Sequence, residues 1–247
     1  MQSATIDLKA PDGTADAYIT RPDEDRPYPP VLFVVDAPGL RPRIEEMADR
    51  IAAKGHIVLA PNVFYRAGRA PVLPLPDFSD PENRADFMRA VRPLMDQLTP
   101  ERVTQDGGAY LDQLERLAGG PAAITGYCLG GRLGWRIAAA HPDRVVALCS
   151  FHGGGLVTDA PDSPHCSADK LKAELYLGHA DQDRSMTPEQ IAVLERALDA
   201  AGVRYRSEIY TGALHGYTMA DAAAYNEVAC ERHFDELFAL LERSFTR

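Results

Sequence analysis

One segment of the sequence has the residue types and the spacing of a catalytic nucleophile. It reads ITGYCLGG and places Cys128 between Gly126 and Gly130, after an apolar run and before a helical pattern that begins near Leu129. This is the nucleophile-elbow pattern G-x-Nuc-x-G, with cysteine in place of serine. A tight turn from strand to helix leaves no room for side chains at the two glycines, and the helix N-terminus favours negative charge on the sulfur. We therefore expect thiolate chemistry at Cys128, with the Leu129 amide directed at a developing oxyanion.

A cysteine beside glycines is more often a small buried side chain than a nucleophile, so the pattern needs support from the rest of the chain. In a fold that presents its nucleophile on such an elbow, an acid and then a histidine follow on loops after later strands. Asp181 and Asp183 follow the apolar run 174–177, and His215 follows the run 205–210. The sequence therefore predicts nucleophile, acid and base in the required order, and it leaves open which aspartate is the acid.

Short apolar runs alternate with helical patterns along most of the chain. This alternation is typical of an α/β fold with a mostly parallel sheet and helices on both faces, and residues 5–9 and 15–20 add an N-terminal antiparallel hairpin at the sheet edge. Helical periodicity is clearest in residues 44–52, after the Thr187-Pro188 start signal and in residues 234–241. The strands expected after the hairpin are residues 31–35, 57–60, 122–125, 145–149, 174–177 and 205–210.

A proline-rich segment at residues 61–81 interrupts the alternation. It is too long for a simple connection between a strand and a helix, so we interpret it as a flap. Pro93 and the Gly107-Gly108 pair lie inside the helical patterns that follow, where they predict kinks. No repeat or linker divides the chain, and residues 1–247 are expected to form one domain.

Together these motifs resemble the dienelactone hydrolases, also called carboxymethylenebutenolidases, which are cysteine-dependent enzymes of the α/β-hydrolase fold. The resemblance extends over nearly the whole chain and rests on GYCLGG around Cys128, GHADQDRSMTPEQ around Asp183 and GALHGY around His215. It implies a Cys128 nucleophile, a His215 base and Asp183 as the acid that orients the histidine, with Asp181 as the alternative. It also implies hydrolysis of small esters or lactones through a thioester acyl-enzyme, without a cofactor.

The resemblance further implies an acidic residue beside the thiol and a second oxyanion donor, both directly after the 31–35 run. Asp36 and Ala37 stand there, and Ala37 is the plausible donor because Pro38 has no N–H. Asp36 is one methylene shorter than the expected glutamate, and it would equally suit a cap of the following turn. Met219 stands where these enzymes have an arginine for the substrate carboxylate, so the sequence favours an uncharged or more hydrophobic ester.

Two more residues are expected near the substrate, namely Tyr127 beside the nucleophile and His152 in an HGGG sequence. In lipases an HGGG motif supplies oxyanion donors but precedes the nucleophile, whereas here it follows Cys128. We therefore interpret it as a glycine-rich turn with His152 in the pocket wall. The remaining histidines and the four cysteines lack the spacing of metal ligands, so we expect no metal site and reduced thiols.

Composition argues against several other classes of function. The 247 residues carry a formal net charge of −10 without a cluster of Lys and Arg, which disfavours nucleic acids and anionic membranes as partners. No signal peptide or apolar run of about 18 residues is evident, so we expect a cytoplasmic protein. A dinucleotide site fails because Cys128 takes the place of the second glycine in G-x-G-x-x-G. Acyl transfer or amide cleavage at the same site, a non-catalytic small-molecule binding module and the oligomeric state all stay open.

Overall fold

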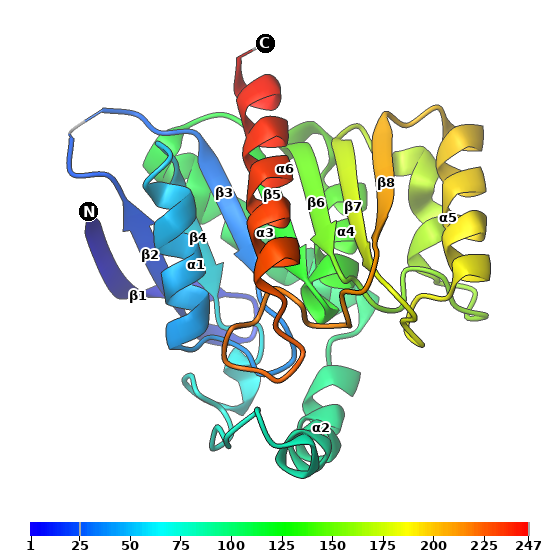
Figure 1. Ribbon diagram of the computed structural model, residues 1–247. Coiled ribbons are helices and arrows are strands. Elements are labelled where there is room, and N and C mark those ends of the chain that lie inside the picture. The colour runs from blue at the N-terminus through cyan, green and yellow to red at the C-terminus, as the bar shows by residue number, and fades with distance from the viewer. Residues whose placement is uncertain (25, 247) are drawn as a thin grey trace.

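The computed structural model describes residues 1–24 and 26–246. The strands are β1 (Gln2–Ala10), β2 (Gly13–Arg21), β3 (Pro30–Val34), β4 (Ile57–Pro61), β5 (Ala122–Tyr127), β6 (Val145–Phe151), β7 (Glu174–Ala180) and β8 (Tyr205–Tyr210). Within the described residues these strands form one sheet in the order β1-β2-β4-β3-β5-β6-β7-β8 (Figure 1). β1 pairs antiparallel with β2, and β2 with β4, whereas all neighbours from β4 to β8 are parallel. The predicted mostly parallel sheet with an N-terminal hairpin at its edge is confirmed.

Helices cover both faces of the sheet. The α-helices are α1 (Pro42–Ala52), α2 (Pro81–Asp96), α3 (Pro100–Ala118), α4 (Leu129–Ala140), α5 (Pro188–Ala201) and α6 (Glu227–Phe245), and short 3-10 helices span Tyr65–Ala67, Pro142–Arg144 and Pro164–Lys170. α1 and α6 pack on one face, whereas α3 and α4 pack on the other, and α5 lies beyond the β8 edge (Figure 1). The layered arrangement is that of the α/β-hydrolase fold.

The sequence patterns that predicted these elements have direct physical counterparts. β3, β4 and β5 are buried along their whole length, as expected for continuous apolar runs in a parallel sheet covered on both faces. The apolar stripe of α1 is buried against the sheet, and α5 begins with a capping box in which Thr187 and Gln190 satisfy each other's backbone amides. Burial of apolar faces and capping of helix ends therefore explain where the main elements lie.

Two helices continue through residues that usually disrupt helices. α2 includes Pro93, and α3 includes Gly107 and Gly108. The glycine at 107 has a packing reason, because a Cβ there would lie 2.5 Å from the side chain of Ile137 on α4. The expected flap at 61–81 contains a 3-10 helix and then an irregular stretch, whose Phe78 forms a β-bridge with Ala222.

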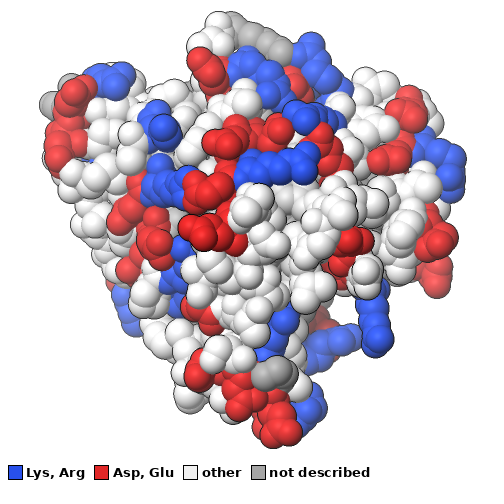
Figure 2. All heavy atoms as spheres, in the orientation of Figure 1, with Lys and Arg blue, Asp and Glu red and all other residues white. Residues whose placement is uncertain are grey.

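The carboxyl ends of the parallel strands point toward one edge of the sheet, at the bottom of Figure 1, with α2 beyond them. Ligand sites of open α/β sheets lie at this edge, because the loops that follow several strands converge there. The face in Figure 2 mixes positive and negative side chains without a broad region of one sign. Within the described chain, no helix has the length and apolarity needed to cross a membrane.

Candidate active site

Cys128 occupies a strained turn between β5 and α4. Its φ of 53° and ψ of −114° lie in a region that side-chain-bearing residues seldom adopt. The flanking glycines permit this turn, because a Cβ on Gly126 would lie 2.2 Å from the Gly130 carbonyl oxygen, and one on Gly130 would lie 2.1 Å from that of Val34. The Cys128 amide donates a 3.1 Å hydrogen bond to the Phe151 carbonyl. The turn expected from the glycine spacing therefore holds the sulfur at the carboxyl edge of the sheet.

The side chains of Cys128, His215 and Asp183 form a continuous chain of contacts. Nε2 of His215 lies 3.0 Å from Sγ of Cys128, and Nδ1 of His215 lies 2.6 Å from Oδ2 of Asp183. The three residues follow β5, β8 and β7, respectively. They are distant in the sequence but meet because parallel strands end at the same edge. The structure thus brings together the nucleophile, acid and base candidates named from the sequence.

The two aspartates after β7 have different partners. Oδ1 of Asp183 accepts hydrogen bonds of 2.8 Å from the Ser185 amide and 2.7 Å from the Ser185 hydroxyl, which leaves Oδ2 for His215. Asp181 instead accepts a 2.8 Å hydrogen bond from the Gly212 amide and so braces the loop that carries His215. Ser185 was missed from the sequence, where a serine two residues after an aspartate indicates only a local turn.

The neighbours of His215 favour its protonated form. Burial by itself lowers the pKa of His215, but the negative charge of Cys128 and the hydrogen bond with Asp183 outweigh burial and raise this pKa to about 10. Burial opposes ionisation of Asp183 as well, yet its hydrogen bonds with His215 and Ser185 hold the pKa of this carboxyl below its ordinary value. The arrangement therefore stabilises an imidazolium beside the Asp183 carboxylate.

Two backbone amides have the places expected for oxyanion donors. Leu129 is the first residue of α4, where amides lack partners inside the helix. Ala37 lines the same pocket as Cys128, and in the described part of the chain its amide donates no hydrogen bond. Its loop is closed by a 3.0 Å hydrogen bond from the Gly39 amide to the Asp36 carbonyl. Both amides are therefore free to bind an oxygen that gains negative charge.

A pocket opens above Cys128 and His215. Its empty volume is about 610 Å³, including open solvent at the mouth. Asp36 forms part of the wall, and its carboxylate is paired with Arg41 at 2.6 Å rather than capping the next turn. Apolar parts of the wall come from Phe78, Met88, Met219 and Ala222. The pocket therefore combines a mainly apolar cavity with a nucleophile at its floor.

The structure corrects the expected place of Tyr127. Its side chain is fully buried, its ring stacks on Phe33 with centroids 4.7 Å apart, and its hydroxyl contacts Thr125 and His233. Tyr127 therefore belongs to the core beneath α6 and does not line the pocket. The physical reason is that β5 is buried on both faces. Its last residue, Tyr127, therefore turns its side chain under a helix, whereas the elbow directs the side chain of Cys128 into the pocket.

His152 lines the pocket as expected. It has a positive φ of 40°, its Nε2 lies 2.8 Å from Oγ1 of Thr218, and its ring centroid lies 5.2 Å from that of His215. Burial holds the pKa of His152 well below its ordinary value. The pocket wall therefore places a neutral imidazole beside the His215 ring.

Comparison with known proteins identifies the family of this chain. The family model with the description "Dienelactone hydrolase family" matches residues 15–245. The chain belongs to the dienelactone hydrolase family. The resemblance drawn from the three sequence motifs is thus confirmed, and the protein is a hydrolase of this family.

Relatives in the dienelactone hydrolase family align with most of this chain. A carboxymethylenebutenolidase from Rhodococcus opacus is 29% identical over 188 residues, which cover 76% of this chain and 69% of the relative. A protein of Escherichia coli, provisionally named carboxymethylenebutenolidase, is 28% identical over 221 residues, which cover 87% of this chain and 77% of the relative.

Solved structures share the same fold. A Klebsiella pneumoniae protein that carries dienelactone hydrolase as a provisional name superposes with a TM-score of 0.84 at 22% identity, covering 97% of each chain. A dienelactone hydrolase-like promiscuous phosphotriesterase from metagenomic libraries superposes with a TM-score of 0.77 at 18% identity, covering 98% of each chain. These likenesses establish the fold of this dienelactone hydrolase family member.

Met219 is the residue that departs from the arginine expected in dienelactone hydrolases. Its sulfur lies 3.5 Å from Nη2 of Arg41, so a guanidinium from a different segment occupies this wall of the pocket. Arg84 on α2 also lines the pocket, and its side chain forms no ion pair within the described residues. Both arginines were missed because they are far from residue 219 in the sequence and follow no motif.

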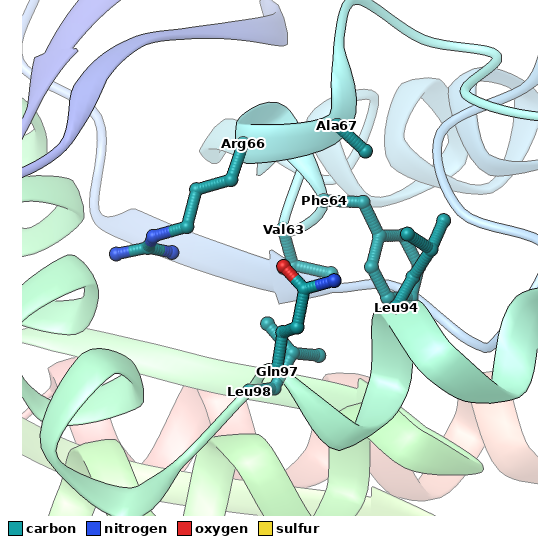
Figure 3. Close-up of a pocket in the computed structure, with 7 residues that line it drawn as sticks. All are labelled: Val63, Phe64, Arg66, Ala67, Leu94, Gln97 and Leu98. Atoms are coloured by element: carbon teal, nitrogen blue, oxygen red, sulfur yellow. The ribbon is translucent and has the colours of Figure 1, made fainter.

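A second, smaller pocket lies between the Tyr65–Ala67 3-10 helix and the end of α2 (Figure 3). Its empty volume is about 220 Å³. Arg66 borders it, but this guanidinium pairs with Asp12 and Asp106 at 2.7 Å each. Its lining residues include no nucleophile and no unpaired charge, so we assign it no chemistry. The other residues that line it are Val63, Phe64, Ala67, Leu94, Gln97 and Leu98.

Proposed function

We propose that this protein hydrolyses small carboxylic esters or lactones with a Cys128-His215-Asp183 triad. The observation that carries the proposal is the chain of contacts from Asp183 through His215 to Cys128 at the floor of a pocket. Membership of the dienelactone hydrolase family supports the same reaction class. Cys128 acts as the nucleophile, His215 transfers protons, and Asp183 fixes the orientation of the imidazole.

Acylation begins when the Cys128 thiolate attacks the carbonyl carbon of the substrate. The carbonyl oxygen becomes an oxyanion, which the amides of Leu129 and Ala37 stabilise, and each such donor typically contributes about 10²–10³-fold to the rate. The C–O bond of the ester then breaks, and the leaving oxygen takes the proton from Nε2 of His215. The products of this step are a thioester on Cys128, a neutral His215 and the alcohol, which stays attached to the acyl group in a lactone.

Deacylation uses the same groups in reverse. Neutral His215 removes a proton from a water molecule as the water oxygen bonds to the thioester carbon. The C–S bond breaks, the carboxylic acid leaves, and the thiolate and imidazolium form again. Asp183 stays ionised throughout and keeps Nδ1 of the ring engaged, so that Nε2 always faces the reacting atoms.

The pocket indicates the size and polarity of the substrate. Its wall of Phe78, Met88, Met219 and Ala222 suits a small acyl group with apolar surface. The name carboxymethylenebutenolidase, carried by the Rhodococcus opacus relative, denotes action on a lactone. We extend the lactone class, but not a particular lactone, to this chain.

The direct test compares wild type with Cys128→Ala on aryl acetates and small unsubstituted lactones. We expect turnover by wild type, loss of turnover in the variant, and an acetyl thioester on Cys128 in acid-quenched wild-type samples. Cys149→Ala is the control, because Cys149 is a buried core cysteine on β6. Equal turnover by wild type and Cys128→Ala would remove the proposal.

Product analysis separates hydrolysis from related reactions. With added alcohols or amines, a hydrolase releases mainly the free acid, whereas an acyltransferase forms a new ester or amide. A protein that only binds ligands gives neither product and shows no accelerated alkylation of Cys128 over its other cysteines.

A further inference from the structure

A buried ion cluster joins the two loops that carry opposite halves of the site. Arg41 is only 2% exposed at its side chain and lies between Asp36 and Asp221. Asp36 and Arg41 belong to the loop after β3, which holds the Ala37 amide, and Asp221 belongs to the loop after β8, which holds His215. Arg41 and Asp221 are 180 residues apart in the sequence. The cluster therefore ties the oxyanion side of the pocket to the histidine side.

The hydrogen bonds of Arg41 use its whole guanidinium group. Nη1 donates to Oδ1 of Asp36 at 2.6 Å and to the Gly39 carbonyl at 3.1 Å, whereas Nη2 donates to Oδ2 of Asp36 at 3.1 Å. Nε and Nη2 donate to the two carboxylate oxygens of Asp221 at 2.6 and 3.2 Å. A guanidinium has five N–H groups, and these contacts give every one an oxygen acceptor.

Two consequences follow for the residues of the pocket wall. Arg41 lines the pocket but has no free donor with which to bind a substrate anion. Arg41 donates hydrogen bonds to both carboxylate oxygens of Asp36, so this carboxylate pairs with the guanidinium and not with the Cys128 thiol. The cluster is therefore arranged to hold parts of the protein together, rather than to contact the reacting atoms.

A separate contact joins α1 to the loop after β8. Nη2 of Arg43 donates a 2.7 Å hydrogen bond to the Thr218 carbonyl, and the Thr218 hydroxyl contacts His152 in the pocket wall. Arg43 reaches a backbone group, whereas Arg41 pairs two carboxylates that would repel each other without it. Arg41 therefore links the loop after β3 to the loop that carries His215 through charged groups on both sides.

We propose that Arg41 is a positioning residue. Through its paired contacts with Asp36 and Asp221, it holds the Ala37 amide at the position relative to Cys128 and His215 that oxyanion binding requires. This inference rests on the proposed function, because it concerns the oxyanion formed during acylation. It does not require Arg41 to touch the substrate. Arg41 therefore affects steps that form an oxyanion and leaves the thiolate–imidazolium pair unchanged.

Two reactions of the same sulfur distinguish this role from general stabilisation of the fold. Acylation by an aryl acetate forms an oxyanion, whereas alkylation by iodoacetamide is a direct displacement at carbon and forms none. Displacement of the Ala37 amide slows acylation but does not slow alkylation. Damage to the thiol pair or to the fold slows both. Peptide mapping is needed for the alkylation assay because Cys166 is also exposed.

The experiment measures both rates in Arg41→Met, Arg41→Lys and Asp221→Asn. We expect the acylation burst of Arg41→Met to fall by about 10²-fold, the typical effect of losing one oxyanion donor, while the alkylation rate of Cys128 and its pH profile stay at the wild-type values. Lysine does not replace the forked pairing of both carboxylates, so Arg41→Lys should recover only part of the loss. Arg50→Met is the control, because Arg50 forms an exposed ion pair with Glu231.

Asp221→Asn keeps the test informative if Arg41→Met does not fold. Asp221 is 32% exposed at its side chain, so this substitution leaves Arg41 paired with Asp36 and loosens only the link to the histidine loop. It should slow acylation and spare alkylation. Wild-type acylation in a variant that lacks either contact, or an equal fall in both rates, would overturn the role of Arg41. Absence of a thioester in wild type would instead disprove the proposed function, so the two failures are distinguishable.

Discussion

Asp183 and His215 are joined by a 2.6 Å hydrogen bond that determines which nitrogen of the imidazole faces the thiol. With Nδ1 engaged by the carboxylate, Nε2 is left 3.0 Å from Sγ of Cys128. Ser185 holds the other oxygen of Asp183 through its amide and its hydroxyl, so the carboxylate itself has little freedom to rotate. The orientation of the ring is thus set by a residue that never contacts the sulfur.

Asp183→Asn should therefore abolish most of the activity without unfolding the protein. An amide can donate to Nδ1 and so stabilise the wrong tautomer, and in other triads this change lowers kcat by about 10⁴-fold. Asp181→Asn is the matched control, since Asp181 contacts the Gly212 amide and not the His215 ring. Steady-state hydrolysis of an aryl acetate by both variants provides the comparison. A larger loss in Asp181→Asn than in Asp183→Asn would reverse their proposed roles.

The pH dependence of acylation should reflect the raised pKa of His215. This pKa is raised to about 10 because the charges of Cys128 and Asp183 outweigh the effect of burial. A raised pKa means that the proton needed by the leaving group is present at neutral pH and is lost only as the pH rises through about 10. The acylation burst measured between pH 6 and 10.5 should consequently fall only near the alkaline end of this range. An alkaline fall near pH 6.5, the value of an ordinary imidazole, would contradict the proposed ion pair.

The elements and the catalytic candidates were predictable because their signals are local. Continuous apolar runs predict strands buried on both faces, and the glycines around Cys128 predict the elbow from steric reasons alone. His215 followed from chain order. Local signals were less decisive for Asp36, whose carboxylate contacts a guanidinium and does not cap a turn. Tyr127 was misplaced because proximity to the nucleophile in sequence says nothing about which face of β5 a side chain occupies.

The rest of the site depends on contacts between distant segments. The pairing of Arg41 with Asp221 links two loops whose relative position exists only in the folded chain. Arg84 reaches the pocket from α2, a helix that carries no motif. The Met219 position shows the consequence, since the absence of an arginine in one loop did not reveal that another loop and a helix supply arginines to the same cavity. Such residues become visible only when the sheet has brought its loops together.

Gly130→Ala tests the steric basis of the elbow. A Cβ at this position would lie 2.1 Å from the Val34 carbonyl oxygen, and backbone atoms cannot move aside as the end of a flexible side chain can. We expect the free energy of unfolding to fall by more than about 3 kcal/mol, measured by urea denaturation. Gly108→Ala is the comparison, because its Cβ would lie 3.3 Å from the side chain of His141 inside a helix that favours alanine. Similar stability of both variants would show that the elbow tolerates a side chain.

Arg84 provides the sharpest test of how this pocket treats charged substrates. Met219 alone predicts a weak preference for carboxylate-bearing esters, but Arg84 lines the pocket and lacks an ion-pair partner in the described chain. Arg84→Met should therefore lower kcat/KM for a carboxylate-bearing ester by about tenfold, the loss expected for one partly exposed charged hydrogen bond, and should affect its neutral methyl ester much less. Arg89→Met is the control on the same helix, because Arg89 pairs with Asp86 and is 73% exposed. If kcat/KM falls equally for both esters in Arg84→Met, the guanidinium does not recognise the charge of the substrate. Any selectivity must then arise from the apolar wall around Met219.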